Sequence, residues 1–233
     1  VTNDKYGLTA RGEKLLDTFG IVAKESVKSS EIKKEENAGD CYNDSCESLI
    51  TELRLSSKDS YNPNRFEKAI RAAFGSGKTD VLIKARTAPK LSYAVAVDAK
   101  STQSGNVTED QIDFDTLKDH RKLHHADYSA IVGCSFRGER LLNRCKEHKV
   151  ALIDVDTLEQ LIRNQVEIPL TGEDYKKIFE QTGIVDISVL DEARNRTERY
   201  GLLVDAIVGC LVNESKDEVT EGILTSREIY RTV

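Results

Sequence analysis

Residues 79–100 read TDVLIKARTAPKLSYAVAVDAK, and this stretch decides the fold that we predict. Its two halves are rich in Val, Ile, Leu and Tyr, and a short turn containing Pro separates them. The pattern predicts strands over 79–85 and 91–100. If the two strands pair as a hairpin, Asp80 at the start of the first strand can lie beside Asp98 in the second.

The second predicted strand has two chemically different faces. Because side chains alternate along a strand, Asp98 and Lys100 share one face, where the small Ala94 and Ala96 leave room beside the carboxylate. The other face is apolar and can pack on a helix. A Lys two residues after an Asp at the end of a buried strand is costly unless the pair is used or mutually satisfied. The pair is therefore either a reactive site or a structural ion pair.

The residue types at this point suit a divalent metal ion. Two converging carboxylates, Asp80 and Asp98, with the neighbouring backbone carbonyl of Ala99, match the oxygen ligands that Mg²⁺ prefers. Lys100 alongside can orient or deprotonate an attacking water and offset negative charge that builds on a phosphorus atom. This combination predicts metal-assisted hydrolysis of a phosphodiester.

This motif of two acids and a lysine resembles that of the PD-(D/E)xK nuclease superfamily. It resembles in particular the cleavage domain of FokI-type (type IIS) restriction endonucleases, which carry an Asp opening one strand and a Val-Asp-x-Lys ending the next, as in residues 97–100. The likeness continues through 129–138 and 151–161, although Thr79 stands where the motif's name has Pro. The resemblance implies a restriction-endonuclease fold, DNA as substrate, and Mg²⁺ binding and water activation by the three motif residues.

Two further residues are candidates for the site. Glu67 lies on a helix predicted over 62–74, and fold relatives often place a helix Glu above the metal, whereas a solvated helix Glu is at least as consistent with the sequence. Gln111 could reach the site, but it also completes a capping box that starts at Thr108 and explains it without a catalytic role.

Residues 61–168 read as helix, strand, strand, helix, strand, helix, strand, helix. Helices between the later strands imply parallel pairing. We therefore predict an α/β fold with a restriction-endonuclease-like core, a mixed central sheet flanked by helices. The later elements are expected as helices over 108–125, 136–148 and 156–163 and strands over 128–134 and 150–155.

The regions outside this predicted nuclease core have less regular patterns of apolar and polar residues. Residues 169–233 are predicted as an all-helical appendage and possible dimer interface, in which 202–212 is so apolar that it must be buried, against the core or another subunit. Residues 24–60 are polar and charged and indicate a linker or peripheral segment, with a short helix or strand near 47–55. Residues 1–23 are expected to end a preceding domain, and a Leu-Thr-x-x-Gly turn there resembles a winged-helix unit. A helical lead-in to the next domain explains the same residues equally well.

Composition bounds the class of protein. Of 233 residues, 39% are hydrophobic and 32% charged, which is typical of a soluble globular protein. No apolar run approaches the roughly 20 residues of a membrane span, and no signal peptide is visible, so we expect a cytoplasmic location. The net charge of −6 neither indicates nor excludes nucleic-acid binding. A start at Val1 and the absence of Met indicate an incomplete polypeptide.

Three other groups of residues could indicate a different binding site. Residues 72–79 loosely fit a nucleotide-binding loop, but a helix precedes them and a strand follows, the reverse of what phosphate binding needs. His120, His124 and His125 lack a completing ligand and fit a helix C-terminus, where with nearby Arg and Lys they contact DNA or form a solvated face. The five cysteines are irregularly spaced and are expected to be thiols.

The sequence thus predicts a Mg²⁺-dependent, site-specific DNA endonuclease, the cleavage domain of a type II or type IIS restriction enzyme. The catalytic residues are Asp80, Asp98, Lys100 and Glu67, and the metal ligands are Asp80, Asp98 and Ala99. Double-stranded DNA is the expected partner, with a homodimer or partner subunit for double-strand cleavage and no membrane. The alternatives are a repair, transposition or junction-resolving nuclease of the same fold, or a non-catalytic DNA-binding module.

Overall fold

The computed structural model describes residues 5–6, 44–74, 81–86, 92–214 and 224–232. The chain divides into two compact units. The larger unit is Asp40–Asn195, and the smaller one combines Val1–Gly39 with Arg196–Val233. The domain boundaries expected from the sequence stay predictions.

The larger unit is built on a five-stranded mixed sheet with the order β2-β3-β4-β5-β6. β2 and β3 pair antiparallel, and each later neighbour pairs parallel. The strands are β2 Val81–Arg86, β3 Ser92–Lys100, β4 Tyr128–Gly133, β5 Val150–Asp154 and β6 Gly183–Ile184. The predicted hairpin and the parallel second half are both confirmed.

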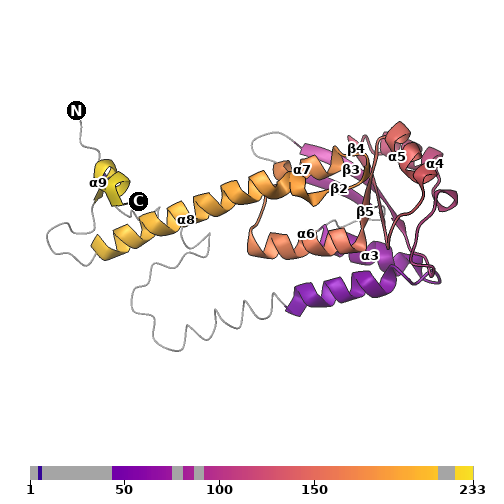
Figure 1. Ribbon diagram of the computed structural model, residues 1–233, viewed down its shortest axis with the longest axis horizontal. Helices are drawn as coiled ribbons and strands as arrows, with labels where there is room; N and C mark the ends of the chain where they lie inside the picture. The colour runs from indigo at the N-terminus through magenta and orange to yellow at the C-terminus, as the bar shows by residue number, and fades with distance from the viewer. Residues whose placement is uncertain (1–4, 7–43, 75–80, 87–91, 215–223, 233) are drawn as a thin grey trace. The chain divides into compact units, whose positions relative to one another are not determined.

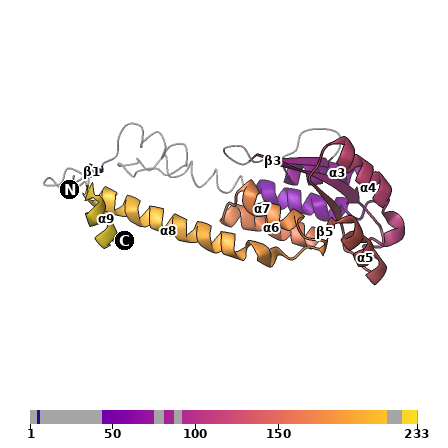
Figure 2. The same ribbon diagram turned by 90° about the horizontal axis from the view of Figure 1, so that it is seen from above.

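Helices cover both faces of this sheet (Figure 1 and Figure 2). They are a helix over 44–56, α3 Pro63–Ala73, α4 Phe114–Leu123, α5 Glu139–His148, α6 Val155–Glu167 and α7 Gly172–Phe179. The helix over 44–56, α3, α6 and α7 pack with one face, and α4 and α5 pack with the other. In β4, Ala130 and Val132 belong to the first apolar cluster and Ile131 to the second, which explains why this strand is a continuous apolar run.

Three predicted helix starts differ from the observed ones. α5 begins at Glu139 and not at 136, and α4 and α6 are each capped by a different residue from the one expected. The Thr108 backbone N–H donates to Gln111 Oε1 at 3.1 Å, but this box opens only a 3₁₀ turn, Glu109–Gln111. α4 starts later, where Asp113 caps it. α6 is capped by Asp154, whose Oδ1 accepts the Thr157 N–H at 2.7 Å, rather than by the predicted segment from Asp156.

The expectation of an all-helical region after residue 169 needs two corrections. β6 adds a fifth strand to the main sheet, and β7 Leu224–Thr225 pairs antiparallel with β1 Lys5–Tyr6, followed by α9 Ser226–Thr232. α8 Asp191–Glu214 buries Ala193 in the first apolar cluster, but within 202–212, where the sequence predicted burial, Leu202, Leu203 and Val204 are 64%, 41% and 42% exposed. Among the described helices, none is both long and apolar enough to cross a bilayer.

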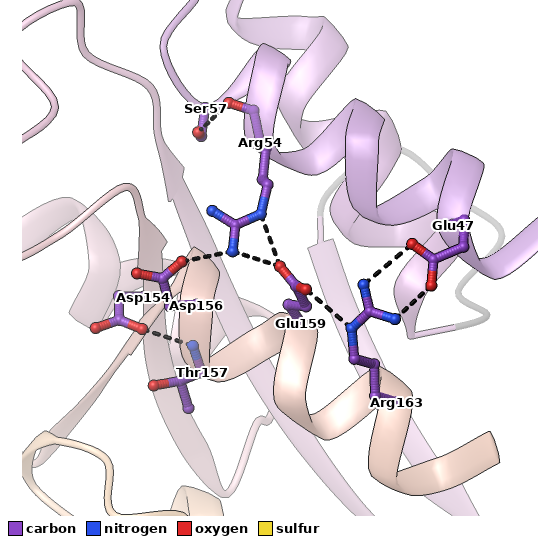
Figure 3. A network of polar contacts seen from close by, with 8 residues as sticks. All are labelled: Glu47, Arg54, Ser57, Asp154, Asp156, Thr157, Glu159 and Arg163. Atoms are coloured by element: carbon purple, nitrogen blue, oxygen red, sulfur yellow. Dashed lines mark hydrogen bonds and ion pairs between the residues drawn. The ribbon is translucent and has the colours of Figure 1, made fainter. Parts of the chain in front are cut away.

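A chain of ion pairs fastens the helix over 44–56 to α6 (Figure 3). Glu159 lies at its centre and accepts from Arg54 Nε at 2.7 Å and from Arg163 Nε at 2.9 Å. Arg163 continues the chain to Glu47, and Arg54 also reaches Asp156 at 2.8 Å. Beneath these charges Leu53 and Leu158 belong to one apolar cluster, so residues 44–56 pack on the core.

Replacing the central acid is expected to loosen this contact. Because Glu159 is only 16% exposed and bridges two guanidinium groups, Glu159→Gln should lower the free energy of unfolding by about 1–2 kcal/mol. Urea denaturation at neutral pH measures the change. The matched control is Asp156→Asn, a more exposed partner of Arg54, which should cost less than about 0.5 kcal/mol.

The difference in the free energy of unfolding between wild type and Glu159→Gln should depend on pH. Burial alone would raise the pKa of Glu159, but hydrogen bonds from Arg163 and Arg54 outweigh burial and lower it. A carboxyl whose pKa falls on folding adds stability above its ordinary pKa of 4.5, and this contribution is lost as pH falls through the folded value. The gap between wild type and Glu159→Gln should therefore narrow as the pH falls below 4.5, and a constant gap would contradict this assignment.

Candidate active site

Asp98 and Lys100 lie together at the carboxyl end of β3. Their side chains share a face, as the strand alternation predicts, and Lys100 Nζ lies 3.0 Å from Asp98 Oδ2. Asp98 pairs in register with Ile131, which belongs to the apolar cluster under α4 and α5, so the two charges project on that side of the sheet. They are 31% and 27% exposed, which leaves both in contact with solvent.

A cleft of about 140 Å³ opens around this pair. Its lining combines the end of β3 with α3 and with one face of α4. The lining residues are Glu67, Val97, Asp98, Ala99, Lys100, Asp113, Thr116, Leu117 and His120. Three of the residues proposed from the sequence as catalytic, Glu67, Asp98 and Lys100, are therefore brought to one place, together with Ala99. Asp80 lies outside the described residues.

Glu67 reaches the cleft from α3. Among the described residues, β2 pairs with β3 only as far as the Val81–Val97 pair, so the last residues of β3 run on beyond it. Glu67 is partly exposed and accepts from Arg71 of the next helical turn at 3.1 Å. Its side chain is 36% exposed and lines the cleft, so the carboxylate is both held by Arg71 and in contact with solvent.

Asp113 is a cleft residue that the sequence interpretation missed. Its Oδ1 accepts the backbone N–H groups of Asp115 at 3.1 Å and Thr116 at 3.0 Å, and its Oδ2 accepts the Thr116 hydroxyl at 2.8 Å. The Thr116 backbone hydrogen bond is the largest cause that lowers the pKa of Asp113, and the positive charge of Lys100 lowers it further. The Asp-Phe-Asp-Thr pattern of an N-cap was the signal that could have identified it.

The remaining candidates have structural explanations. Gln111 accepts the Thr108 N–H and does not line the cleft, so its capping interpretation is confirmed. His120 lines the cleft, and its ring lies edge-on to His124 with centroids 6.1 Å apart. Cys46, Cys134, Cys145 and Cys210 are free thiols, and Cys41 and the glycine-rich residues 75–78 fall outside the described part of the chain.

The cleft contains hard oxygen donors, besides the nitrogen atoms of Lys100 and His120. Glu67 and Asp98 offer carboxylates, and Ala99 offers a main-chain carbonyl, which fits Mg²⁺ with several retained waters. Within the described ranges, no group of three or more His, Cys, Asp and Glu side chains is close enough to hold a metal by itself. Water or a further ligand is therefore needed to complete any metal site built on Asp98.

Comparison with known proteins adds little detail. No protein-family model matches the chain, and no curated protein matches it. The chain is similar to a solved structure described as restriction endonuclease FokI, with 16% identity and a TM-score of 0.46 over 59% of this chain. The match spans only 31% of the FokI chain. At these values the likeness transfers neither residue roles nor activity.

The end of β3 is packed so closely that one glycine is required beside it. Gly133 is the register partner of Lys100, and a Cβ there would meet Val107 Cγ2 at 2.8 Å and the Lys100 carbonyl oxygen at 3.3 Å. Val107 is fully buried, so it has no free space into which to move. The position of Lys100 thus depends on the absence of a side chain at 133.

Gly133→Ala is expected to destabilise the chain by about 1–3 kcal/mol, because the added methyl overpacks a filled site. Thermal unfolding measures the loss. The control is Gly201→Ala on α8, where nothing lies within 4 Å of the added Cβ. There the substitution should be neutral or stabilising by up to about 1 kcal/mol. Equal effects at the two glycines would contradict the packing described around Lys100.

Proposed function

We propose that the chain is a metal-dependent nuclease that hydrolyses phosphodiester bonds of double-stranded DNA in the cleft at the end of β3. The observation that carries the proposal is the pairing of Asp98 with Lys100 in a solvent-open cleft that also receives Glu67 from α3. A structural ion pair needs no cleft and no second carboxylate. A hydrolytic site needs all of them.

Each residue of the cleft has a separate role in the proposed hydrolysis. Asp98, Glu67 and the Ala99 carbonyl would hold Mg²⁺, which when bound polarises the phosphate and lowers the pKa of a bound water. Lys100 orients the attacking water and offsets the negative charge that develops on the phosphate oxygens. The water oxygen gives up a proton to solvent and bonds to phosphorus, the bond from phosphorus to the sugar oxygen breaks, and the leaving oxygen takes up a proton from solvent.

Asp80 belongs to this proposal as a further ligand. The antiparallel register pairs Val81 with Val97. If that register continued by one residue, it would set Asp80 against Asp98, where the two carboxylates would share one ion. This extension supplies the further protein ligand that the described residues lack.

The type of nuclease, the place of sequence recognition and the need for a dimer are inferred from the family resemblance of the sequence. We propose the cleavage domain of a type II or type IIS restriction endonuclease, with sequence recognition elsewhere and with residues 1–23 ending a winged-helix unit. One site per chain cuts one strand, so cleavage of both needs a homodimer or a partner subunit. The exposed apolar side chains of α8 make residues 169–233 the candidate interface. Repair, transposition or junction cleavage are distinguished by the cleavage pattern on defined duplexes.

One observation favours a different class of function. Asp98 and Lys100 lie 3.0 Å apart and satisfy each other's charge, as a non-catalytic DNA-binding module with the same fold would allow. Nicking of supercoiled plasmid separates the two functions. The nuclease requires Mg²⁺ and stops with EDTA, whereas the binding module shifts DNA in a gel and leaves it intact in both conditions.

Asp98→Ala is expected to abolish cleavage, with a loss of at least about a thousandfold, because it removes a carboxylate that holds the ion. Folding and DNA binding should persist, since the side chain is partly exposed and stands beside small residues. Plasmid nicking, circular dichroism and a gel shift with Ca²⁺ measure the three properties. The control is Asp119→Ala, an exposed α4 carboxylate that does not line the cleft. Cleavage retained by Asp98→Ala would refute the assignment.

Lys100→Ala is expected to reduce the cleavage rate more than the metal affinity. The ammonium acts on water and phosphate, and its removal frees Asp98 from a competing cation. Single-turnover rates and Ca²⁺ titration by calorimetry measure the two quantities. If the variant unfolds instead, the pair is a structural ion pair and the catalytic role of Lys100 is wrong.

A further inference from the structure

Asp113 is the most rigidly held carboxylate of the cleft. Its three hydrogen bonds to Asp115 and Thr116 fix both oxygens at the first turn of α4. A carboxylate has about four acceptor positions, so three are occupied by the helix and one remains open. Capping alone explains the three bonds, but it does not explain why this carboxylate also lines the cleft with Lys100.

The chain connection places Asp113 near the end of β3. α4 is the crossover helix between the parallel strands β3 and β4, so it runs back along the sheet and its first turn lies over the carboxyl ends of the strands. That end is where β3 presents Lys100. The lowered pKa of Asp113, to which the charge of Lys100 contributes, supports the same proximity.

Lys100 and a divalent cation compete for one carboxylate. Lys100 Nζ lies 3.0 Å from Asp98 Oδ2, the oxygen surface that the proposed function assigns to metal binding. When a cation binds there, the ammonium is both displaced and repelled, because two positive charges then face each other at close range. A displaced ammonium in a partly buried cleft needs another acceptor.

We propose that Asp113 is a positioning residue that receives the ammonium of Lys100 when a divalent cation takes Asp98. The inference rests on the proposed nuclease function and adds to it a second carboxylate for Lys100. Asp113 holds Lys100 inside the cleft and toward the water instead of letting it swing into solvent. Asp98 is thereby released for the cation.

The test uses Asp113→Asn, because Asn caps a helix as well as Asp and removes the charge. Its amide oxygen can still accept the backbone N–H groups, and its NH2 group can donate to the Thr116 hydroxyl, which donates to Asp113 Oδ2 in the wild type. Asp113→Ser is a second variant that removes the charge and keeps a helix-capping side chain, so a folding defect particular to Asn would be detected. The matched control is Asp115→Asn, a carboxylate of the same first turn that does not line the cleft. Each variant is made in the wild-type and in the Lys100→Ala background, which completes a double-mutant cycle.

Three quantities are measured on the full chain. Asp113→Asn should lower kcat for DNA cleavage about tenfold with KM unchanged within about twofold, and it should weaken Ca²⁺ binding in calorimetry about fivefold. Asp115→Asn should change neither by more than about twofold. In the Lys100→Ala background the two Asn variants should be indistinguishable in Ca²⁺ affinity, since no ammonium is left to relocate.

Several results would overturn the inference. If wild type cleaves DNA while Asp113→Asn and Asp115→Asn behave alike, Asp113 is only a helix cap. An equal Ca²⁺ effect of Asp113→Asn with and without Lys100 would mean a general charge effect. If wild type folds and never cleaves, the nuclease proposal fails by itself, and the Ca²⁺ cycle still decides the role of Asp113. No Ca²⁺ binding by wild type would overturn both.

Discussion

The cost of burying charge governs the arrangement of β3. One face of this strand belongs to the apolar cluster under α3, α6 and α7, where Val95 is fully buried. The other face carries Asp98 and Lys100, which are tolerated only because they pair and keep contact with water. The carboxyl end of β3 therefore has to remain accessible to solvent on this face. The cleft is the space that this requirement leaves between β3, α3 and α4.

Much of the larger unit could be predicted because its signals are local. Helix α3 starts at Pro63 as its sequence indicates, and the alternation in β3 placed Asp98 and Lys100 on one face. Errors arose where two caps compete within a few residues, as with Thr108 and Asp113. The capping box at Thr108 and the cap at Asp113 both form. Asp113 starts the longer helix, since Phe114 and Leu117 of α4 pack into the apolar cluster under α4 and α5.

Other features depend on distant parts of the chain and have no local signal. β6 is a two-residue strand whose pairing with β5 is set by the sheet edge and not by its own pattern. The gathering of Glu67 with Asp98 requires α3 to pack beside β3, which neither segment encodes alone. Asp113 has a sufficient local role as a cap, and this role concealed its place in the cleft. The apolar sequence of 202–212 suggested burial, although Leu202, Leu203 and Val204 are exposed in the single chain.

The charges of the cleft explain why a cation suits it. Among the described residues, the lining contributes three carboxylates, Glu67, Asp98 and Asp113, against the ammonium of Lys100 and the guanidinium of Arg71 that pairs with Glu67. One negative charge is left over, and Asp80 would bring a second under the proposed extension of the register. Two uncompensated negative charges in a partly buried space repel each other, and a divalent ion relieves that repulsion more fully than one more side-chain ammonium would. Under the proposed function, Lys100 would be a mobile counter-charge: it pairs with Asp98 and would pass to Asp113 when a divalent ion binds.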